Sequence, residues 1–288
     1  MNEADFITAL RALPLHSAAR GLDDDCAVLE VGGETLILTH DAMAEGTHYR
    51  EDADMADVAW KLIATNLSDL ASKGADPIGV LLGHSLGEND ARFLEGLSEA
   101  LTAFDTPLLG GDTVASPNPR TLGLTAIGRA THTPVPSRSS AKAGDAIYVT
   151  GQLGAAMLGF EGDAAYLAAF NRPVPLLSEG QALAPHVSAI MDVSDGLLLD
   201  AWRMAKASAV CFQLDKAEIP VADASRIDEC IRWGDDYQLL FTADPAANLP
   251  IPASRIGTVI AAAKPALHLD GKALSPTDGL GYSHARPA

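Results

Sequence analysis

Three aspartates of the chain directly follow short apolar runs of the kind that forms buried strands. Asp41 follows the run 35–40, Asp112 follows 106–111, and Asp192 follows 189–191, with Asp195 three residues further on. In α/β sheets, ligands gather beyond the carboxyl ends of the strands. We therefore expect these carboxylates to point into one shared cleft.

Three further aspartates extend this set. Asp24 and Asp25 precede a predicted strand at 27–29, and Asp69 lies on a predicted helix. We expect that no neighbouring Lys or Arg neutralises them. Carboxylates that converge in one cleft raise one another's pKa unless a cation binds among them, and all-oxygen ligation suits Mg²⁺ or Ca²⁺. The set thus predicts a metal site, and Mg²⁺ would bring phosphates with it; the alternative for any single Asp is a turn residue or a helix N-cap.

Contacts to a phosphate are harder to find in the sequence. Neither the P-loop pattern G-x-x-x-x-G-K-[ST] nor G-x-G-x-x-G occurs, so a bound nucleotide would need another kind of site. The glycine-containing turns 110–113 and 151–154 offer backbone N–H groups to an anion, and Arg138 stands among serines. The alternatives are glycines that serve only backbone geometry and an arginine that is merely exposed.

Composition excludes several classes of partner. The chain has 288 residues and a formal net charge of −18, which repels nucleic acid and anionic membrane surfaces. No apolar run approaches the ~20 residues of a membrane span, and the N-terminus carries acids where a secretory signal needs bases. Three widely spaced cysteines suggest neither a disulfide framework nor a zinc site. We expect a cytoplasmic protein that binds neither nucleic acid nor membrane.

The elements that must position the aspartates alternate between strand and helix. In the first half, apolar residues at three- and four-residue steps predict helices at 57–73 and 89–104. The predicted strands of that half are 35–41, 77–83, 106–112 and 121–128. The second half repeats the pattern with a helix at 197–206 and apolar runs at 146–151, 189–196, 209–215, 237–243 and 255–262. The fold class is therefore α/β.

A polar stretch with two prolines, 131–137, is the best linker candidate. We place the domain boundary there, which gives units 1–136 and 137–288. Each unit has enough strands and helices to form a sheet and a core of its own. The sequence shows no short-period repeat and no low-complexity segment.

Seven motifs in a fixed order give the chain a family resemblance. They are DDDCAVL, THDAMAEGTHY, NLSDLASKGADP, GGDT, SRSSAKAGDAIYVTG, MDVSDGL and GDDYQLLFT. Over nearly its whole length the chain resembles the thiamine-monophosphate kinases, a family within the superfamily of aminoimidazole ribonucleotide synthetase. The resemblance implies two domains of mixed sheet with helices packed on one face. It also implies a homodimer formed through the N-terminal sheet and an active-site cleft that the C-terminal domain completes.

The resemblance further implies an enzyme that transfers the γ-phosphoryl group of ATP to thiamine monophosphate with several Mg²⁺ ions. No side chain is assigned as nucleophile or base, because a phosphate acceptor is already largely dianionic at pH 7. The implied metal ligands are Asp24, Asp25, Thr39, His40, Asp41, Asp69, Asp112, Asp192 and Asp195. The implied nucleotide contacts are Gly111, Asp112, Arg138 and Ser194, and the implied contacts to thiamine phosphate are His48, Asp235 and Tyr282.

Three departures from the family pattern leave alternatives open. Asp23 replaces a usual Gly before the first aspartate pair, His40 replaces a Thr, and Asp235 replaces a Glu that is one methylene longer. One alternative is another ATP-using enzyme of the superfamily, such as a selenophosphate synthetase or an amidine-forming ligase. The reactive cysteine motifs of selenophosphate synthetases and of the hydrogenase maturation proteins are absent here. The other alternative is a non-catalytic nucleotide or metal sensor on the same fold.

Overall fold

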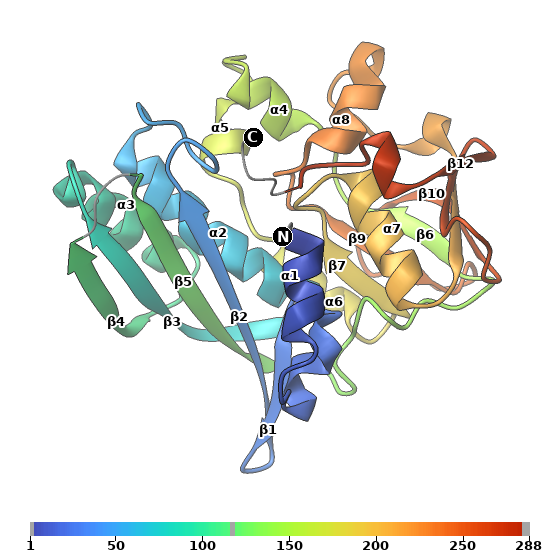
Figure 1. Cartoon of the computed structure of the whole chain (residues 1–288), viewed down its shortest axis with the longest axis horizontal. Coiled ribbons are helices and arrows are strands. Elements are labelled where there is room, and N and C mark those ends of the chain that lie inside the picture. The colour runs from blue at the N-terminus through green and yellow to red at the C-terminus, as the bar shows by residue number, and fades with distance from the viewer. Residues whose placement is uncertain (1–2, 116–118, 284–288) are drawn as a thin grey trace.

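Two β-sheets lie side by side in the computed structural model, which describes residues 3–115 and 119–283 (Figure 1). The first sheet has five strands in the order β1-β2-β5-β3-β4, and the second has seven in the order β12-β11-β8-β10-β6-β9-β7. Both are mixed, because β3 runs parallel to β4 and β8 parallel to β11 while the other pairs are antiparallel. The predicted α/β class is confirmed.

The strands of the first sheet are β1 (Ala27–Val31), β2 (Glu34–Ala44), β3 (Ala75–Leu86), β4 (Leu108–Ala115) and β5 (Thr121–Ala130). Those of the second are β6 (Ala146–Val149), β7 (Ala189–Asp192), β8 (Cys211–Leu214), β9 (Leu239–Ala243), β10 (Ser254–Ile260), β11 (Leu267–Leu269) and β12 (Lys272–Leu274). The α-helices are α1 (Glu3–Leu10), α2 (Met55–Ser72), α3 (Asp90–Ala103), α4 (Ala155–Phe160), α5 (Leu167–Asn171), α6 (Leu177–Leu183), α7 (Leu197–Ala207) and α8 (Ile227–Trp233). All the predicted strands and helices are present, with ends shifted by a few residues.

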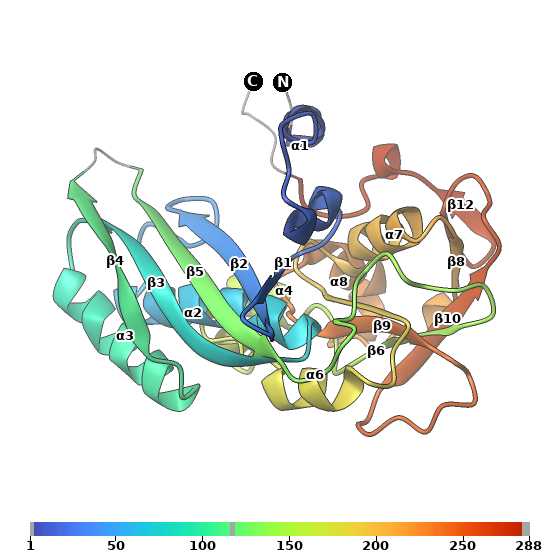
Figure 2. The same cartoon turned by 90° about the horizontal axis from the view of Figure 1, so that it is seen from below.

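Helix α2 is the element on which the first half of the fold is built. The carboxylate of Asp54 caps its start by accepting a hydrogen bond from the backbone N of Ala56, and the helix stops just before Gly74, whose φ of +61° is left-handed. Its apolar face is fully buried against the sheet. Figure 2 shows α2 and α3 on the same side of this sheet.

Strand alternation decides which side chains face α2. On β2, the side chains of Thr39 and Met43 are buried with those of α2, whereas His40 is exposed on the opposite face. The prediction that two strands end at aspartates is wrong: β2 stays paired with β5 past Asp41 to Ala44, and β4 stays paired with β3 past Asp112. Both carboxylates thus lie within strands.

The second sheet has helices on both faces. Helices α7 and α8 pack with the larger core of this half, and Leu183 of α6 packs on the other face. Helix α6 also lies close against α2, because a Cβ on Gly180 would meet the backbone O of Ala71 at 1.9 Å. This contact ties the two halves together. Among the described residues, no helix combines the length and apolarity needed to cross a bilayer.

Candidate active site

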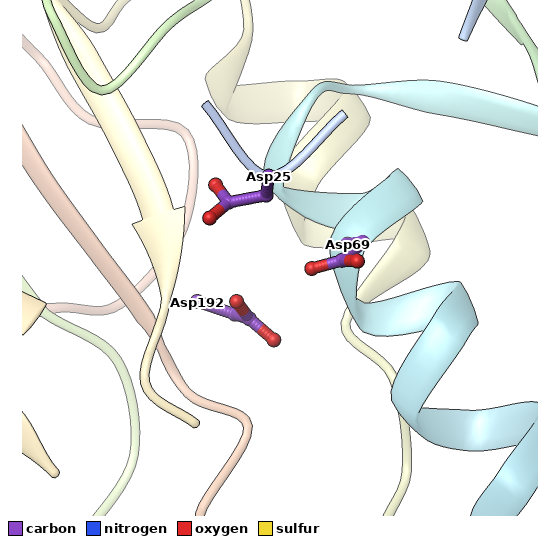
Figure 3. Close-up of side chains that lie close together, drawn as sticks. All are labelled: Asp25, Asp69 and Asp192. Atoms are coloured by element: carbon purple, nitrogen blue, oxygen red, sulfur yellow. The ribbon is translucent and has the colours of Figure 1, made fainter. Parts of the chain in front are cut away.

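Three of the predicted aspartates converge where the two sheets meet. Asp25 lies just before β1, Asp69 lies on α2, and Asp192 is the last residue of β7. One carboxylate oxygen from each lies within 4.8 Å of the other two, and Figure 3 shows the three side chains pointing into the same space. Residues distant in the sequence thus form one all-oxygen cluster.

Hydrogen bonds from neutral groups hold these carboxylates in place. The hydroxyl of Thr39 donates to Asp69, and the hydroxyl of Ser68 donates to Asp192 at 2.6 Å. The backbone N of Asp41 donates to Oδ1 of Asn66 on α2 at 3.0 Å, which holds this strand segment beside the cluster. Within the described residues, no Lys or Arg forms an ion pair with the carboxylates of Asp41, Asp69 or Asp192.

Burial and repulsion between carboxylates make Asp41, Asp69 and Asp192 hard to ionise. Burial, followed by the charge of Asp25, raises the pKa of Asp192 to about 8 and that of Asp41 to about 6. Burial and the charges of Asp41 and Asp192 raise the pKa of Asp69 well above its usual range. A divalent cation among the oxygens would relieve both effects. The carboxylates of Asp69 and Asp192, which have no basic partner among the described residues, fit a hard ion such as Mg²⁺ together with Asp25.

Asp24 and Asp25 differ, because basic side chains neutralise them. Asp24 pairs with Arg20 at 2.6 Å and with Lys73 at 2.7 Å, through different carboxylate oxygens. Asp25 pairs with Lys73 at 2.8 Å and with Arg138 at 3.4 Å. Although burial alone would raise the pKa of both carboxyls, these cations hold it below the usual range.

The expectation that no Lys or Arg neutralises the set is therefore wrong at this end of the cluster. Its physical reason is that the chain folds the end of α2 onto the start of β1, which brings Lys73 to Asp24. A metal ion at Asp24 would have to displace Arg20 or Lys73, because both carboxylate oxygens are already bound. This geometry argues against the predicted metal role of Asp24.

Two more predicted ligands, His40 and Asp195, direct their side chains to other partners. The ring of His40 lies on the opposite face of the sheet, where its Nδ1 is 2.9 Å from Oγ1 of Thr125. Only the backbone carbonyl of His40 remains available for the predicted metal role. Asp195 forms an ion pair with Arg203, and its backbone carbonyl accepts a hydrogen bond from the N of Tyr282 at 2.9 Å.

Comparison with known proteins places the chain in a family. Residues 23–130 match the family described as "AIR synthase related protein, N-terminal domain". The chain is 40% identical to the thiamine-monophosphate kinase of Salmonella typhimurium, over 77% of this chain and 75% of that relative. The chain belongs to the thiamine-monophosphate kinase family.

Other members of the thiamine-monophosphate kinase family match over more of their length. The enzyme of Escherichia coli K12 is 36% identical over 92% of this chain and 91% of its own. A solved structure described as "AaThiL complexed with AMPPCP and TMP" matches with a TM-score of 0.86 at 25% identity, covering 99% of this chain and 97% of that one. The similarity therefore spans both sheets.

The predicted nucleotide contacts of this thiamine-monophosphate kinase family member lie in two places. Arg138 is beside Asp25, and its Nε donates to the backbone carbonyl of Asp23 at 2.7 Å. Ser194 follows β7, where its backbone N donates to Asp200. Gly111 and Asp112 instead lie on the exposed edge strand β4.

Asp112 does not join the cluster within one chain. Strands β5 and β3 separate β4 from β2, and the pairing register puts Asp112 one residue from the row of Asp41. Three strand spacings amount to about 14 Å, which is too far for two carboxylates to share an ion. The register also pairs Asp112 with Gly83, on the face of the sheet away from α2.

Two of the three predicted thiamine-phosphate contacts, Asp235 and His48, lie at a buried lysine. Nζ of Lys61 on α2 lies 2.7 Å from Oδ2 of Asp235 and 3.5 Å from the backbone carbonyl of His48. Tyr237 donates its hydroxyl hydrogen bond to Oδ1 of Asp235 at 2.8 Å. The third predicted contact, Tyr282, is 42% exposed and lies near Asp195.

A cavity of about 330 Å³ opens beside Lys61, between α2 and the helices α4 and α5. Aromatic and acidic side chains line it. They include Tyr49, Asp57, Phe160 and Phe170. The cavity is large enough for a small aromatic ligand.

Sequence reasoning missed several residues of the site. Lys73, Lys61, Ser68 and Asn66 all lie on α2 or at its end and contact a predicted site residue or its backbone. A signal for Lys73 was present, because it stands four residues after Asp69, one helical turn further on. No signal in the sequence joined Lys61 to Asp235, which are 174 residues apart.

Proposed function

We propose that this chain transfers the γ-phosphoryl group of ATP to the phosphate of thiamine monophosphate, which yields thiamine diphosphate and ADP. The observation that carries the proposal is the cluster of Asp25, Asp69 and Asp192 in a chain that is 40% identical to a thiamine-monophosphate kinase. The solved structure "AaThiL complexed with AMPPCP and TMP" supports the choice of both substrates.

Mg²⁺ is the cofactor that we propose for this cluster. The donors are carboxylate oxygens, and their raised pKa values favour a site that gains stability from a bound cation. When bound there, Mg²⁺ would offset the negative charge of the phosphate groups. Asp25, Asp69 and Asp192 would hold it, with Asp41 and the carbonyl of His40 beside them.

The residues of the chain itself would bind and orient two anions. Phosphoryl transfer depends mainly on positioning and on charge stabilisation, and a phosphate acceptor needs no general base. Arg138 and the backbone around Ser194 flank the cluster and suit the phosphates of ATP. We therefore assign no nucleophile or base to the protein.

The acceptor would bind on the other side of the cluster, near Lys61. The ammonium of Lys61 lies between Asp235 and the carbonyl of His48, and the cavity beside it carries aromatic side chains. Such a cavity suits the heteroaromatic rings of thiamine monophosphate. Asp235, His48 and Tyr282 remain our proposed contacts to this substrate.

We further propose that the chain works as a homodimer of two-domain subunits, divided at 136/137. Each sheet has its own hydrophobic core, which supports that division. The exposed leucines on β3 and β4 support association through the first sheet. In such a dimer, Asp112 of one subunit could approach the carboxylate cluster of the other subunit, although it lies too far from the cluster of its own chain. A cytoplasmic location stays a prediction from the sequence.

A coupled ADP-release assay with thiamine, thiamine monophosphate and inorganic phosphate as acceptors tests the function. We expect ADP only with thiamine monophosphate and Mg²⁺, and thiamine diphosphate as the product in chromatography. Asp192→Asn should lower turnover by at least ~100-fold while the circular dichroism spectrum stays the same. The exposed Asp105→Asn variant serves as the matched control. ATP binding without product would instead support a non-catalytic nucleotide sensor.

A further inference from the structure

Lys73 is a fully buried lysine at the edge of the carboxylate cluster. It follows the last residue of α2, and its side chain is 0% exposed. Its Nζ donates to Asp24 at 2.7 Å, to Asp25 at 2.8 Å and to the backbone carbonyl of Ile190 at 3.3 Å. An ammonium group has three hydrogen-bond donors, so all of them are used. A buried ammonium is stable only when such partners compensate its charge.

The carboxylates therefore divide into two groups, one neutralised by basic side chains and one without a basic partner among the described residues. Around Asp24 and Asp25, the protein itself provides cations, namely Lys73, Arg20 and Arg138. Around Asp69 and Asp192, the described residues provide only hydroxyl donors. Asp25 belongs to both parts, because it contacts Lys73 and also lies within 4.8 Å of the other two carboxylates.

We propose that the ammonium of Lys73 is a built-in cation of this site, which takes the place of a divalent ion between Asp24 and Asp25. This inference rests on the proposed Mg²⁺ site. An ion bound to Oδ2 of Asp25 at the ~2.1 Å typical of Mg²⁺–oxygen contacts would lie within about 5 Å of Nζ, given the 2.8 Å between Nζ and that oxygen. Repulsion at that distance confines metal ions to the side of Asp69 and Asp192.

A purely structural lysine is the competing explanation, because Lys73 also ties the start of β1 and the backbone of β7 to α2. Loss of stability in a variant would fit both explanations. The number of metal ions bound separates them, because a structural tie has no effect on it.

Lys73→Met tests the inference, since it keeps an unbranched side chain only one atom shorter and removes its charge. After chelation, Mn²⁺ alone is titrated and counted by equilibrium dialysis with electron paramagnetic resonance. We expect the variant to bind an additional Mn²⁺ ion per chain and to show a larger rise in melting temperature with Mg²⁺ than the unsubstituted chain. Lys206→Met on the exposed side of α7 is the matched control and should change neither value. An unchanged Mn²⁺ count would overturn the inference.

The variant Lys73→Gln covers the case in which Lys73→Met does not fold. It also removes the positive charge, but its amide can still donate hydrogen bonds to the carboxylates, and Asp24 and Asp25 both stay in place. We expect it to bind an additional Mn²⁺ ion as well; the same count as the unsubstituted chain refutes the inference. Turnover of thiamine monophosphate by the unsubstituted chain is a separate readout. Its absence would refute the proposed function without altering the Mn²⁺ counts.

Discussion

Asp235 occupies an unusual backbone position and holds a buried cation. Its φ of 57° is left-handed, a conformation that Asn tolerates as well as Asp. Its two carboxylate oxygens bind Lys61 and the hydroxyl of Tyr237. Substitution by Asn therefore keeps the backbone and the shape but removes the charge that compensates Lys61.

For Asp235→Asn we expect KM for thiamine monophosphate to rise by about 10- to 100-fold, which corresponds to about 1.4–2.7 kcal/mol. The effect on kcat should be smaller, because the residue is not placed at the reacting phosphates. Steady-state kinetics with varied thiamine monophosphate measure both constants. Asp228→Asn, an exposed carboxylate paired with Lys216, should leave KM unchanged. An unchanged KM in Asp235→Asn would remove this residue from the substrate site.

At the scale of single residues, the convergence of the aspartates was easier to predict than the ion pairs that some of them form. The types and positions of Asp25, Asp69 and Asp192 were enough to predict that their carboxylates converge; the shared cation stays a prediction. Side chains alternate between the two faces along β2, so the sequence could also have predicted that His40 points away from Thr39 and Asp41. We instead expected the strand to end at Asp41 and did not apply the alternation there. The ion pairs of Asp24 were beyond reach, because they depend on how closely α2 approaches β1.

The packing of α3 on α2 depends on a glycine. A Cβ at Gly96 of α3 would lie 2.1 Å from the backbone O of Ala56 on α2. Alanine normally favours a helix by up to ~1 kcal/mol over glycine. Here the added methyl group would push the two helices apart, at a cost of about 1–3 kcal/mol.

We therefore expect Gly96→Ala to lower the free energy of unfolding by about 1–2 kcal/mol, against its intrinsic helix propensity. Urea denaturation followed by circular dichroism measures the change. Ser98→Ala, at an exposed position of the same helix, should be neutral or slightly stabilising. A stabilised Gly96→Ala variant would mean that α3 packs less closely on α2 than described here.

At the scale of elements, the spacing of apolar residues predicted the individual helices but not how they pack on one another. Apolar residues at helical spacing gave α2, α3 and α7 with ends within two residues, because each helix buries one face of its own sequence. The close contact of α6 with α2 at Gly180 left no such pattern. It is a property of two segments that meet only in the folded chain.

Among the described residues, several buried carboxyl groups have a pKa well above the usual range. Burial raises the pKa of Asp41 to about 6, of Asp192 to about 8, and of Asp200 and Asp236 to about 7, from 3.8. A carboxyl whose folded-state pKa is raised binds more protons when folded than when unfolded. These groups therefore lower stability as pH rises from about 4 to about 8.

In the absence of metal we expect the melting temperature to fall between pH 5 and pH 8, and millimolar Mg²⁺ to oppose that fall. Asp41 alone accounts for at most about 3 kcal/mol, at about 1.4 kcal/mol for each pKa unit. Differential scanning fluorimetry across this pH range, with chelator or with Mg²⁺, measures the effect. Asp192→Asn should flatten the profile and reduce the response to Mg²⁺. A metal-free profile that rises with pH would contradict this charge assignment.

The open face of the first sheet links the oligomeric state to the site. Leu81, between the inward-facing Val80 and Leu82, is 39% exposed, and Leu109 and Val114 on the neighbouring edge strand are half exposed. Asp112 lies on the same strand, about 14 Å from Asp41 across three strand spacings. If Asp112 acts on the metal site, it acts in the site of a second copy.

Mixing two inactive variants tests that arrangement directly. Asp112→Asn and Asp192→Asn should each be inactive alone, because every site of either dimer lacks one carboxylate. After unfolding and refolding together, random pairing should restore roughly a quarter of the sites, since each mixed dimer contains one site with both aspartates. Leu81→Lys places a charge on the open face and should yield a monomer in size-exclusion chromatography with light scattering. No regained turnover in a mixture shown to contain mixed dimers would mean that Asp112 has no role in the neighbouring site.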